Sequence, residues 1–324
     1  MRNLGLPLGL ICLAAQAPAH AHVKWFVDTN TATVENFQPY SITDTPVLIW
    51  MAIAALIFVV SAFLDTRLPK VKVADSKTRH DFIEILRIFT GMSFLLTAYD
   101  GALIAPHHVA YGMFGDAMVL LQATIGIMLL ANRFIHHASI LIVILYLGLI
   151  VQYGVVSALE YVNILGISLF LLFNNLPSPS LQAKLKPYSV DALRILTGLA
   201  LFVLGVTEKL HGALYGQAFI ADFQWNFMPY LGFEMFDDRL FVLSAGISEC
   251  ILGILLMMGT TTRLTTLTIS GFMLTSNIVF IVQGNREAAL MEFVGHLPII
   301  GSALVLILLG YGQKLKVTQL FARS

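Results

Sequence analysis

Charged residues and cysteines are both scarce in this sequence. Charged side chains make up 12% of the 324 residues, against about 25% in an average soluble domain. Lys plus Arg and Asp plus Glu number 19 each, so the formal net charge is zero and no basic surface points to nucleic acid as a partner. The sequence also has no dinucleotide-binding motif, no haem-attachment motif and no cysteine cluster. Any electron chemistry must therefore use a bound small molecule or another chain.

Hydrophobic residues, in contrast, make up 57% of the sequence, and the mean hydropathy is +0.81. This composition is typical of a polytopic membrane protein. Most of the predicted apolar spans approach the ~20 residues that cross a ~30 Å hydrocarbon layer. Nine spans are expected: 46–64, 82–104, 116–132, 138–157, 160–176, 192–211, 240–258, 264–283 and 290–311.

Residues 1–21 are typical of a secretory signal peptide, with one Arg, a short apolar core and a small-residue pattern that predicts cleavage before His22. Cys12 would leave with that peptide, so Cys250 has no partner for an internal disulfide and dithiol chemistry within the chain is excluded. Residues 22–45 are then a periplasmic N-terminal segment, and the span 46–64 is an extra transmembrane helix.

Basic residues set the orientation. The predicted inner loops hold most of the Lys and Arg residues, whereas the outer segments hold only Lys24, Lys209, Arg239 and Arg286. The positive-inside rule therefore predicts a bacterial inner-membrane protein with a periplasmic mature N-terminus and a cytoplasmic C-terminal tail, 313–324.

The sequence also contains an internal repeat. Three segments recur in the same order: EILRIFTG and DALRILTG, QATIGIMLL and ECILGILLM, LEYVNILG and MEFVGHLP. We therefore predict two four-helix units, 80–176 and 188–312, joined by a Pro- and Ser-rich linker, 177–187. The predicted fold class is all-α: a polytopic membrane protein of about nine transmembrane helices, built as one extra helix plus two tandem four-helix bundles.

Ionisable residues gather in the second unit. Glu249 stands where the first unit has Gln122, and His296 stands where it has Ile164. An ionised carboxylate near the middle of a span costs on the order of 2.5–3.5 kcal/mol, so Glu249 must face the interior, be neutral or be paired. It is either a proton, quinone or metal ligand, or a protonated Glu that hydrogen-bonds a neighbouring helix.

Two further acids accompany Glu249 as candidate catalytic residues. Glu208 and His211 are three residues apart, so they are expected to share one face of a helix, and Glu292 and His296, four apart, are expected to do the same. A dimetal site of the kind that four-helix bundles hold is disfavoured because only one pair has the Glu-x-x-His spacing. The alternative for Glu208 is an interfacial ion pair with Lys209 or Arg239.

Histidines on the predicted outer side are the candidate metal ligands. They are His22, His107, His108 and His211. Cleavage before His22 would give that residue both a free amine and an imidazole, a donor set that suits copper. The alternative is that the sequence around His22 is only a signal-peptidase site. Arg87 and Arg194, at matching repeat positions, are expected to extend to lipid phosphate.

The second unit resembles the DoxX family. RILTGLALFVLGVTEKLHG is followed by LSAGISECILGILLMMGTTTRLTTL, and the family repeat has Glu-Lys-Leu, then a Glu, a Gly-x-Leu-Leu run and a closing Gly-x-x-x-Arg. These positions match Glu208 and Lys209, then Glu249, and then Gly259 and Arg263. The resemblance covers residues 188–312 well and 82–176 only in outline. It implies a four-helix membrane bundle, in some members similar to the membrane subunit of a thiosulfate:quinone oxidoreductase.

The sequence thus favours a non-catalytic, quinone-facing membrane subunit or partner of a periplasm-facing redox or export system. Its buried Glu residues would handle protons or a quinone head group. Lys209, His211, His296 and Arg263 are the candidate cofactor-binding residues; the sequence does not identify the cofactor, for which a quinone is one candidate and copper the alternative. One alternative is a protein that binds or transports a periplasmic metal such as copper. The other is an assembly or structural factor with no site.

Overall fold

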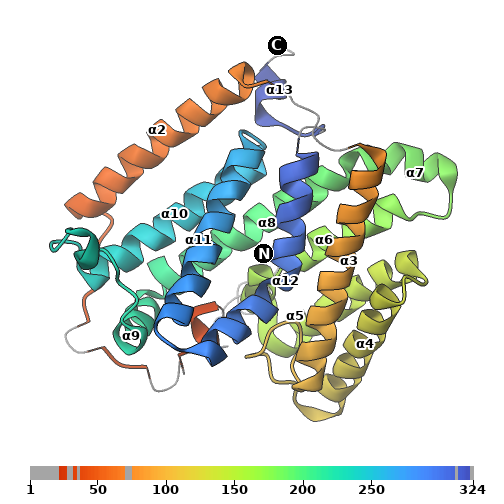
Figure 1. Ribbon diagram of the computed structural model, residues 1–324, viewed down its shortest axis with the longest axis horizontal. Coiled ribbons are helices and arrows are strands. Elements are labelled where there is room, and N and C mark those ends of the chain that lie inside the picture. Colours follow the sequence, from red (N-terminus) through yellow and green to blue (C-terminus); the bar gives the residue numbers. More distant parts are fainter. Residues whose placement is uncertain (1–21, 28–31, 35–36, 70–74, 311–312, 322–324) are drawn as a thin grey trace, which may run out of the picture.

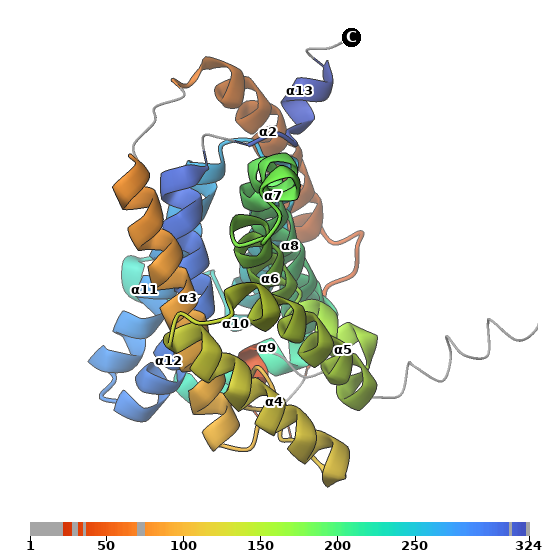
Figure 2. The same cartoon turned by 90° about the vertical axis from the view of Figure 1, so that its right-hand side faces the viewer.

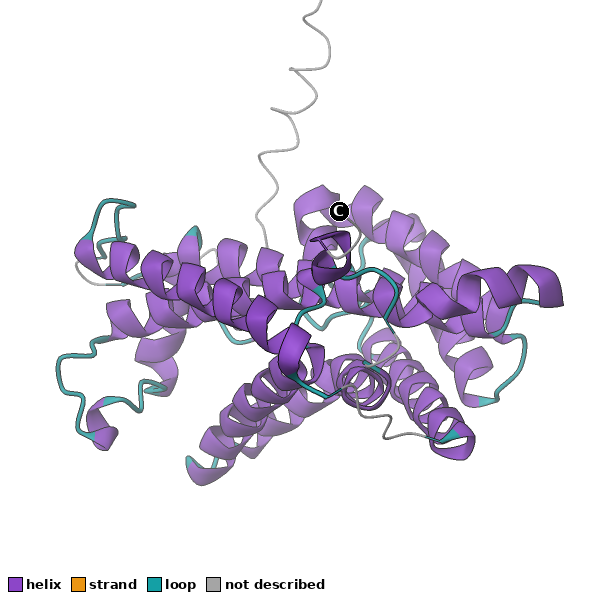
Figure 3. Cartoon of the chain, turned by 90° about the horizontal axis from the view of Figure 1, so that it is seen from above, coloured by secondary structure: helices purple, strands orange, loops and turns teal. Residues whose placement is uncertain are grey.

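The computed structural model describes residues 22–27, 32–34, 37–69, 75–310 and 313–321, and in this part of the chain the regular structure is entirely helical (Figures 1 and 3). In chain order the helices are η2 (His22–Trp25), α2 (Thr45–Arg67), α3 (Ser76–Tyr99), α4 (Gly112–Leu130), α5 (Ile135–Glu160), α6 (Asn163–Asn174), α7 (Pro179–Leu185), η3 (Lys186–Tyr188), α8 (Ser189–Leu204), η4 (Gly205–Leu210), α9 (Ala213–Phe223), η5 (Pro229–Leu231), α10 (Asp238–Met258), α11 (Thr262–Val282), α12 (Arg286–Leu309) and α13 (Val317–Phe321).

The membrane character predicted from the sequence is confirmed. Within the described ranges, eight helical stretches are long and apolar enough to cross a bilayer. The remaining expected span, 160–176, does not match any of these eight stretches. It contains the 12-residue helix α6, which is shorter than a full crossing. One crossing stretch, Pro179–Leu210, begins inside the predicted linker, because Pro179 starts a helix there instead of a loop. The predicted signal segment, 1–21, lies outside the described residues.

The two repeat units pack into one another. Along the chain, α3 packs on α4, α4 on α5 and α5 on α6, and likewise α8 on α10, α10 on α11 and α11 on α12. The first helix of each unit also packs on the last helix of the other unit, because α8 lies against α6 and α3 lies against α12 (Figure 2). The eight helices α3, α4, α5, α6, α8, α10, α11 and α12 therefore close into a ring, in which the two units contact each other at two junctions.

Matching contacts within the two units support the internal repeat. The guanidinium of Arg87 donates to the carbonyl oxygens of Leu129 and Leu130 at the end of α4. Arg194 donates in the same way to Leu256 and Met257 at the end of α10. Each Arg also pairs with the acid three residues before it, Glu84 at 2.5 Å and Asp191 at 3.0 Å. The side chains cap helix ends that lack amide donors.

The expected lipid contacts of Arg87 and Arg194 are therefore wrong. Their exposed fractions are only 4% and 0%. The first helix of each unit places its Arg within reach of the last carbonyl groups of the next helix, and these buried oxygens attract the guanidinium more strongly than a distant headgroup does.

Glycine residues allow the closest helix contacts. A Cβ atom at Gly253 would lie 2.6 Å from the carbonyl oxygen of Gly198, and one at Gly126 would lie 3.0 Å from that of Gly91. Both pairs are at matching repeat positions, so α3 crosses α4 and α8 crosses α10 at glycines. Small residues commonly mediate such close packing between membrane helices.

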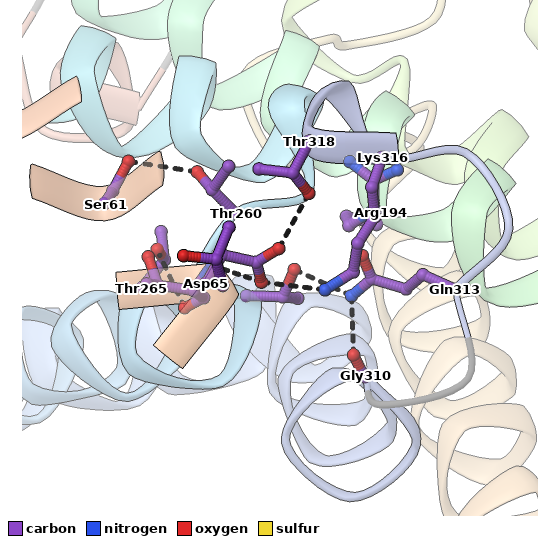
Figure 4. A network of polar contacts seen from close by, with 12 residues as sticks. Ser61, Asp65, Arg194, Thr260, Thr265, Gly310, Gln313, Lys316 and Thr318 are labelled. Atoms are coloured by element: carbon purple, nitrogen blue, oxygen red, sulfur yellow. Dashed lines mark hydrogen bonds and ion pairs between the residues drawn. The ribbon is translucent and has the colours of Figure 1, made fainter. Parts of the chain in front are cut away.

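The extra helix α2 lies at the edge of the ring, with only 6% of its most apolar stretch buried, and packs on α10 (Figure 1). The end of α2 near Arg67 is held by the C-terminal tail, as Figure 4 shows. The carboxylate of Asp65 accepts from Lys316 Nζ at 2.8 Å and from Thr318 Oγ1 at 2.9 Å. The same tail reaches α8, because Lys314 N donates to Asp191 at 2.7 Å. The tail therefore ties α2 and α8 together.

We predict that Gly253→Ala destabilises the protein, because the added methyl group would overlap the backbone of α8. The expected loss is about 1–3 kcal/mol, measured as a lower unfolding temperature in detergent. Gly271→Ala on α11 is the matched control, since a Cβ atom there meets nothing within 4 Å. The control should be neutral or gain up to about 1 kcal/mol, because Ala favours a helix over Gly. An equal effect at both positions would contradict the close-packing argument.

Candidate functional site

The candidate site begins where α8 widens into the π-helical turn η4, Gly205–Leu210. The amide of His211 donates to the carbonyl oxygen of Val206, five residues earlier, at 2.7 Å. Turns of this kind are rare and often occur at functional sites. The turn places Glu208 fully inside the protein, whereas His211 is exposed. The expectation that Glu208 and His211 share a face is therefore wrong, because it assumed regular helical spacing.

Lys209 joins two carboxylates. Its ammonium nitrogen lies 3.3 Å from the carboxylate of Glu208 and 3.0 Å from that of Glu249 on α10. Gly246 makes this approach possible, because a Cβ atom there would lie 2.8 Å from Lys209 Cβ. The exposed fraction of the side chains increases from 0% at Glu208 through 16% at Lys209 to 25% at Glu249. The site therefore runs from a sealed acid to an accessible one.

The equivalent position in the first unit carries no charge. Gln122, which stands where the second unit has Glu249, donates through Nε2 to Thr97 Oγ1 at 2.8 Å and to the carbonyl oxygens of Phe94 and Ala102, both at 3.1 Å. Its amide oxygen accepts from Ile104 N at 2.8 Å. Gln122 is thus saturated by neutral partners, and the charged version of this position occurs only in the second unit.

The N-terminal segment enters the site, which the sequence did not predict. The amide of Val23 donates to Glu208 Oε1 at 3.1 Å. Trp25 donates from its indole nitrogen to the hydroxyl of Tyr161 at 3.2 Å, and its ring lies against Gly295, where even a Cβ atom would overlap it. Phe26 packs between Phe219 and Phe223 of α9 and Phe280 of α11, with ring centroids 5.3–5.8 Å apart. Val23, Trp25 and Phe26 therefore pack into the interior beside Glu208.

Three of the predicted histidines meet around Tyr161 and Trp25. The rings of His107 and His108 are 4.0 Å apart, and that of His108 lies 5.2 Å from Tyr161. On the other side, the ring of His296 lies 5.3 Å from Trp25. His108 and His296 are buried. The pair His107–His108 comes from the α3–α4 loop and His296 from α12, so the two units both contribute to this aromatic group.

Glu160 is a site residue that the sequence interpretation missed. It ends α5, is 1% exposed, and its carboxylate accepts from Thr207 Oγ1 in η4 at 2.6 Å. The signal for it was present in the repeat, because aligning LEYVNILG with MEFVGHLP places Glu160 opposite Glu292.

The described contacts of Glu292 and Arg263 are with α11 and α12. Glu292 is buried, accepts from the hydroxyl of Ser276 on α11, and has no partner among the described residues for its other oxygen. Arg263 donates to the carbonyl oxygens of Ile307 and Leu308 at the end of α12. This end is ~20 Å from Glu292 along a helix that rises ~1.5 Å per residue. The structure therefore does not bring Arg263 into the site.

The metal candidates are only partly placed by the structure. His107 and His108 are adjacent, His211 is exposed elsewhere, and the side chain of His22 lies outside what is described. In the described part of the chain, no three His, Cys, Asp or Glu side chains are grouped so that they could hold a metal ion.

A surface depression beside α9 contains none of these groups. It is lined by Ile220, Ala221, Gln224, Asn226, Tyr230 and Asp238. Because it has no buried ionisable side chain, we place the candidate site at Lys209 and its two carboxylates, where charge and burial coincide.

In comparisons with known proteins, the chain matches no family model, no curated protein and no solved structure.

We predict that Trp25→Phe and Tyr161→Phe destabilise the protein non-additively, because each variant removes the same hydrogen bond. Each should cost about 1 kcal/mol, and the double variant should cost less than the sum. The measurement is a double-mutant cycle of unfolding in detergent. Trp50→Phe is the control: Trp50 donates to Ser244 at 3.0 Å on the outside of α10, so its effect should add to that of Tyr161→Phe. Additivity in both cycles would show that the N-terminal segment is not held by Tyr161.

Proposed function

We propose that this multi-pass membrane protein is a quinone-facing subunit, or a partner, of a periplasm-facing redox system in the bacterial inner membrane. The mature N-terminus would be periplasmic and the C-terminus cytoplasmic, in line with the distribution of Lys and Arg. The resemblance of residues 188–312 to the DoxX family motif belongs to this proposal as well.

The observation that carries the proposal is the ammonium of Lys209 between the carboxylates of Glu208 and Glu249. Ionisable residues inside a membrane protein are costly and usually serve a function. A quinone needs hydrogen-bond donors at its carbonyl oxygens and, on two-electron reduction, two protons. An ammonium with adjacent carboxylates offers both a donor and groups that exchange protons.

Each residue has a separate task in this scheme. Lys209 would donate a hydrogen bond to a carbonyl oxygen of the head group, since its nitrogen has three donor positions. Glu249, the most exposed of the three, would exchange protons with the outside. Glu208, sealed and fixed by the Val23 amide, would keep Lys209 protonated and correctly placed.

The electrons must come from elsewhere, because the sequence has no nucleotide-binding, haem-attachment or cysteine-cluster motif. A quinone-facing role thus implies a partner protein that supplies them. This requirement favours a subunit over a stand-alone enzyme.

We expect the detergent-purified protein to retain quinone and Lys209→Met to lose it, because the variant removes the hydrogen-bond donor. A lost charged hydrogen bond, worth about 1.5–3 kcal/mol, corresponds to a roughly 10- to 150-fold weaker affinity. Glu249→Gln should reduce quinone-linked activity with less effect on retention. Extraction and chromatography of the lipid-soluble fraction provide the measurement.

Glu287→Gln is the matched control for these variants, because Glu287 is an exposed acid at the start of α12, away from Lys209. The proposal fails if the native protein carries no more quinone than an unrelated membrane protein purified in the same way. If Glu249→Gln also leaves cellular function intact, an assembly or structural factor without a site becomes the better description.

Copper binding is the second candidate, favoured by the convergence of the N-terminal segment and the histidine pair on Tyr161. The ring of Tyr161 contacts both His107 and His108, and its hydroxyl accepts from Trp25, three residues after His22. An N-terminal His22 would bring an amine and an imidazole to the same region.

We predict that, if copper binds, His108→Ala and His22→Ala each abolish stoichiometric binding measured by elemental analysis after equilibration with copper and desalting. The control is the other adjacent pair: the rings of His136 and His137 lie 3.7 Å apart at the start of α5, yet neither is near the N-terminal segment. His137→Ala should therefore leave binding unchanged. A native protein without copper, or equal losses at both pairs, would eliminate this candidate.

A further inference from the structure

An apolar surface lies around the start of α10. In the loop between α9 and α10, the large apolar side chains are 56–96% exposed at Tyr230, Leu231, Phe233 and Met235. Ile42, just before α2, is also largely exposed. We name these residues the apolar rim. Large apolar side chains that cluster on a surface usually mark a contact with a partner or a membrane.

Arg239, in the first turn of α10, joins the segment before α2 to the loop before α10. Its guanidinium donates to the carbonyl oxygen of Pro39 at 3.0 Å and pairs with the carboxylate of Asp44 at 3.6 Å. It also lies 3.7 Å from the ring centre of Tyr40. From there, α2 and α10 pack against each other (Figure 1). The apolar rim therefore belongs to the shared starting end of two membrane helices.

The loop that carries most of the rim has a fixed fold. Asn226, which is buried, donates to the carbonyl oxygen of Phe236 at 2.8 Å and to the carboxylate of Asp238 at 2.9 Å. The short helix η5 ends at Gly232, whose φ of 89° is in the left-handed region that favours glycine. These contacts hold the loop closed, so the exposure of its apolar side chains is a feature of the folded protein.

The lengths of the two helices place the rim near the edge of the hydrocarbon layer. α10 has 21 residues and α2 has 23. At ~1.5 Å per residue they are ~32 Å and ~35 Å long, close to the ~30 Å of a bilayer core, so each helix starts near the boundary between acyl chains and headgroups. Met235 and Ile42 each stand three residues before the start of their helix. Since a residue spans at most ~3.6 Å, both lie within ~11 Å of that boundary.

The surroundings of the rim favour lipid as its partner. Only 6% of the most apolar stretch of α2 is buried, and its exposed side chains, such as Leu48, continue the apolar surface that begins at Ile42. The charged residues in the loop next to the rim are acidic and exposed: Glu234, Asp237 and Asp238. Carboxylates repel anionic headgroups, so the contact must be apolar and not electrostatic.

We propose that the apolar rim is a membrane anchor, whose side chains insert between the headgroups and the upper acyl chains of the leaflet at this end of the bundle. Tyrosine is enriched at this level of membrane proteins, as Tyr230 would be. The anchored loop joins α9, which packs on η2 and η4, to α10, which carries Glu249. Insertion therefore fixes both helices beside the candidate site relative to the bilayer. The inference depends on neither a quinone nor a metal.

The test measures which medium surrounds a nitroxide label on the rim. The label is attached to Met235→Cys in phosphatidylcholine vesicles, in a chain whose Cys12 and Cys250 are changed to Ser. Oxygen concentrates among acyl chains, whereas a nickel chelate stays in water. Leu56→Cys, exposed on α2, gives the lipid reference, and Arg133→Cys, exposed in the α4–α5 loop, gives the aqueous one. We expect an oxygen-to-nickel collision ratio several-fold above the aqueous reference and below the lipid reference.

Three results would contradict the anchor. A label on Met235→Cys that matches Arg133→Cys lies in water. A label shielded from both reagents is covered by protein, either a second copy of the chain or another partner. A collision ratio that rises only when phosphatidylglycerol is added to the vesicles shows an electrostatic contact, which the acidic residues next to the rim should prevent.

Removal of neighbouring rim side chains gives a second measurement. Leu231→Gln combined with Phe233→Gln should move the collision ratio at Met235→Cys towards the aqueous reference, because the loop then gains little from insertion. Tyr99→Gln is the matched control, since Tyr99 is 91% exposed at the end of α3 and is not part of the rim. An unchanged ratio in the double variant, or an equal change in the control, would refute the anchor. Quinone retention is measured separately, so failure of this inference and failure of the proposed function are distinguishable.

Discussion

The burial of the Glu208 carboxylate is the constraint on which the end of the bundle around η4 depends. A fully enclosed anion must be met by donors and cations, because burial removes it from bulk water. Two elements supply them: η4 contributes Lys209 and the N-terminal segment contributes the Val23 amide, while the carboxylate of Glu249 on α10 shares the ammonium. Two local features let these groups meet. The π-helical turn η4 places Glu208 inside the protein, and the missing side chain at Gly246 leaves room for Lys209.

The two units show how a repeat can keep its framework and change its chemistry. Both retain an Arg that caps the end of the next helix and a glycine contact between the first two helices, so they share these two packing features. They differ where Gln122 is replaced by Glu249. The amide satisfies itself with backbone groups, whereas the carboxylate requires Lys209. The two units therefore differ at this position in charge and not in framework.

The sequence predicted what depends on local composition. Long apolar runs determine membrane crossing by themselves, and repeated segments indicate matching helices. The all-α membrane fold could therefore be predicted, and so could the choice of Glu208, Lys209 and Glu249 as candidate site residues. Contacts between distant segments could not. Nothing local indicates that Trp25 reaches Tyr161, or that Arg194 caps α10 instead of extending to lipid. His211 was misplaced because a π-helical turn cannot be distinguished from a regular helix by spacing alone.

The two ends of the helix bundle are held by different kinds of contact. At the end that carries the C-terminal tail, Arg194 bonds to several carbonyl groups and to Asp191, and the tail joins α2 through Asp65. Several charge-assisted contacts must break together for these helices to separate. At the other end, the N-terminal segment contributes the Val23 amide to Glu208 and the Trp25 indole to Tyr161, and Phe26 packs on α9. Because Arg194 lies near the start of α8 and Lys209 follows the end of that helix, the two sets of charged contacts are ~20 Å apart along a helix that rises ~1.5 Å per residue.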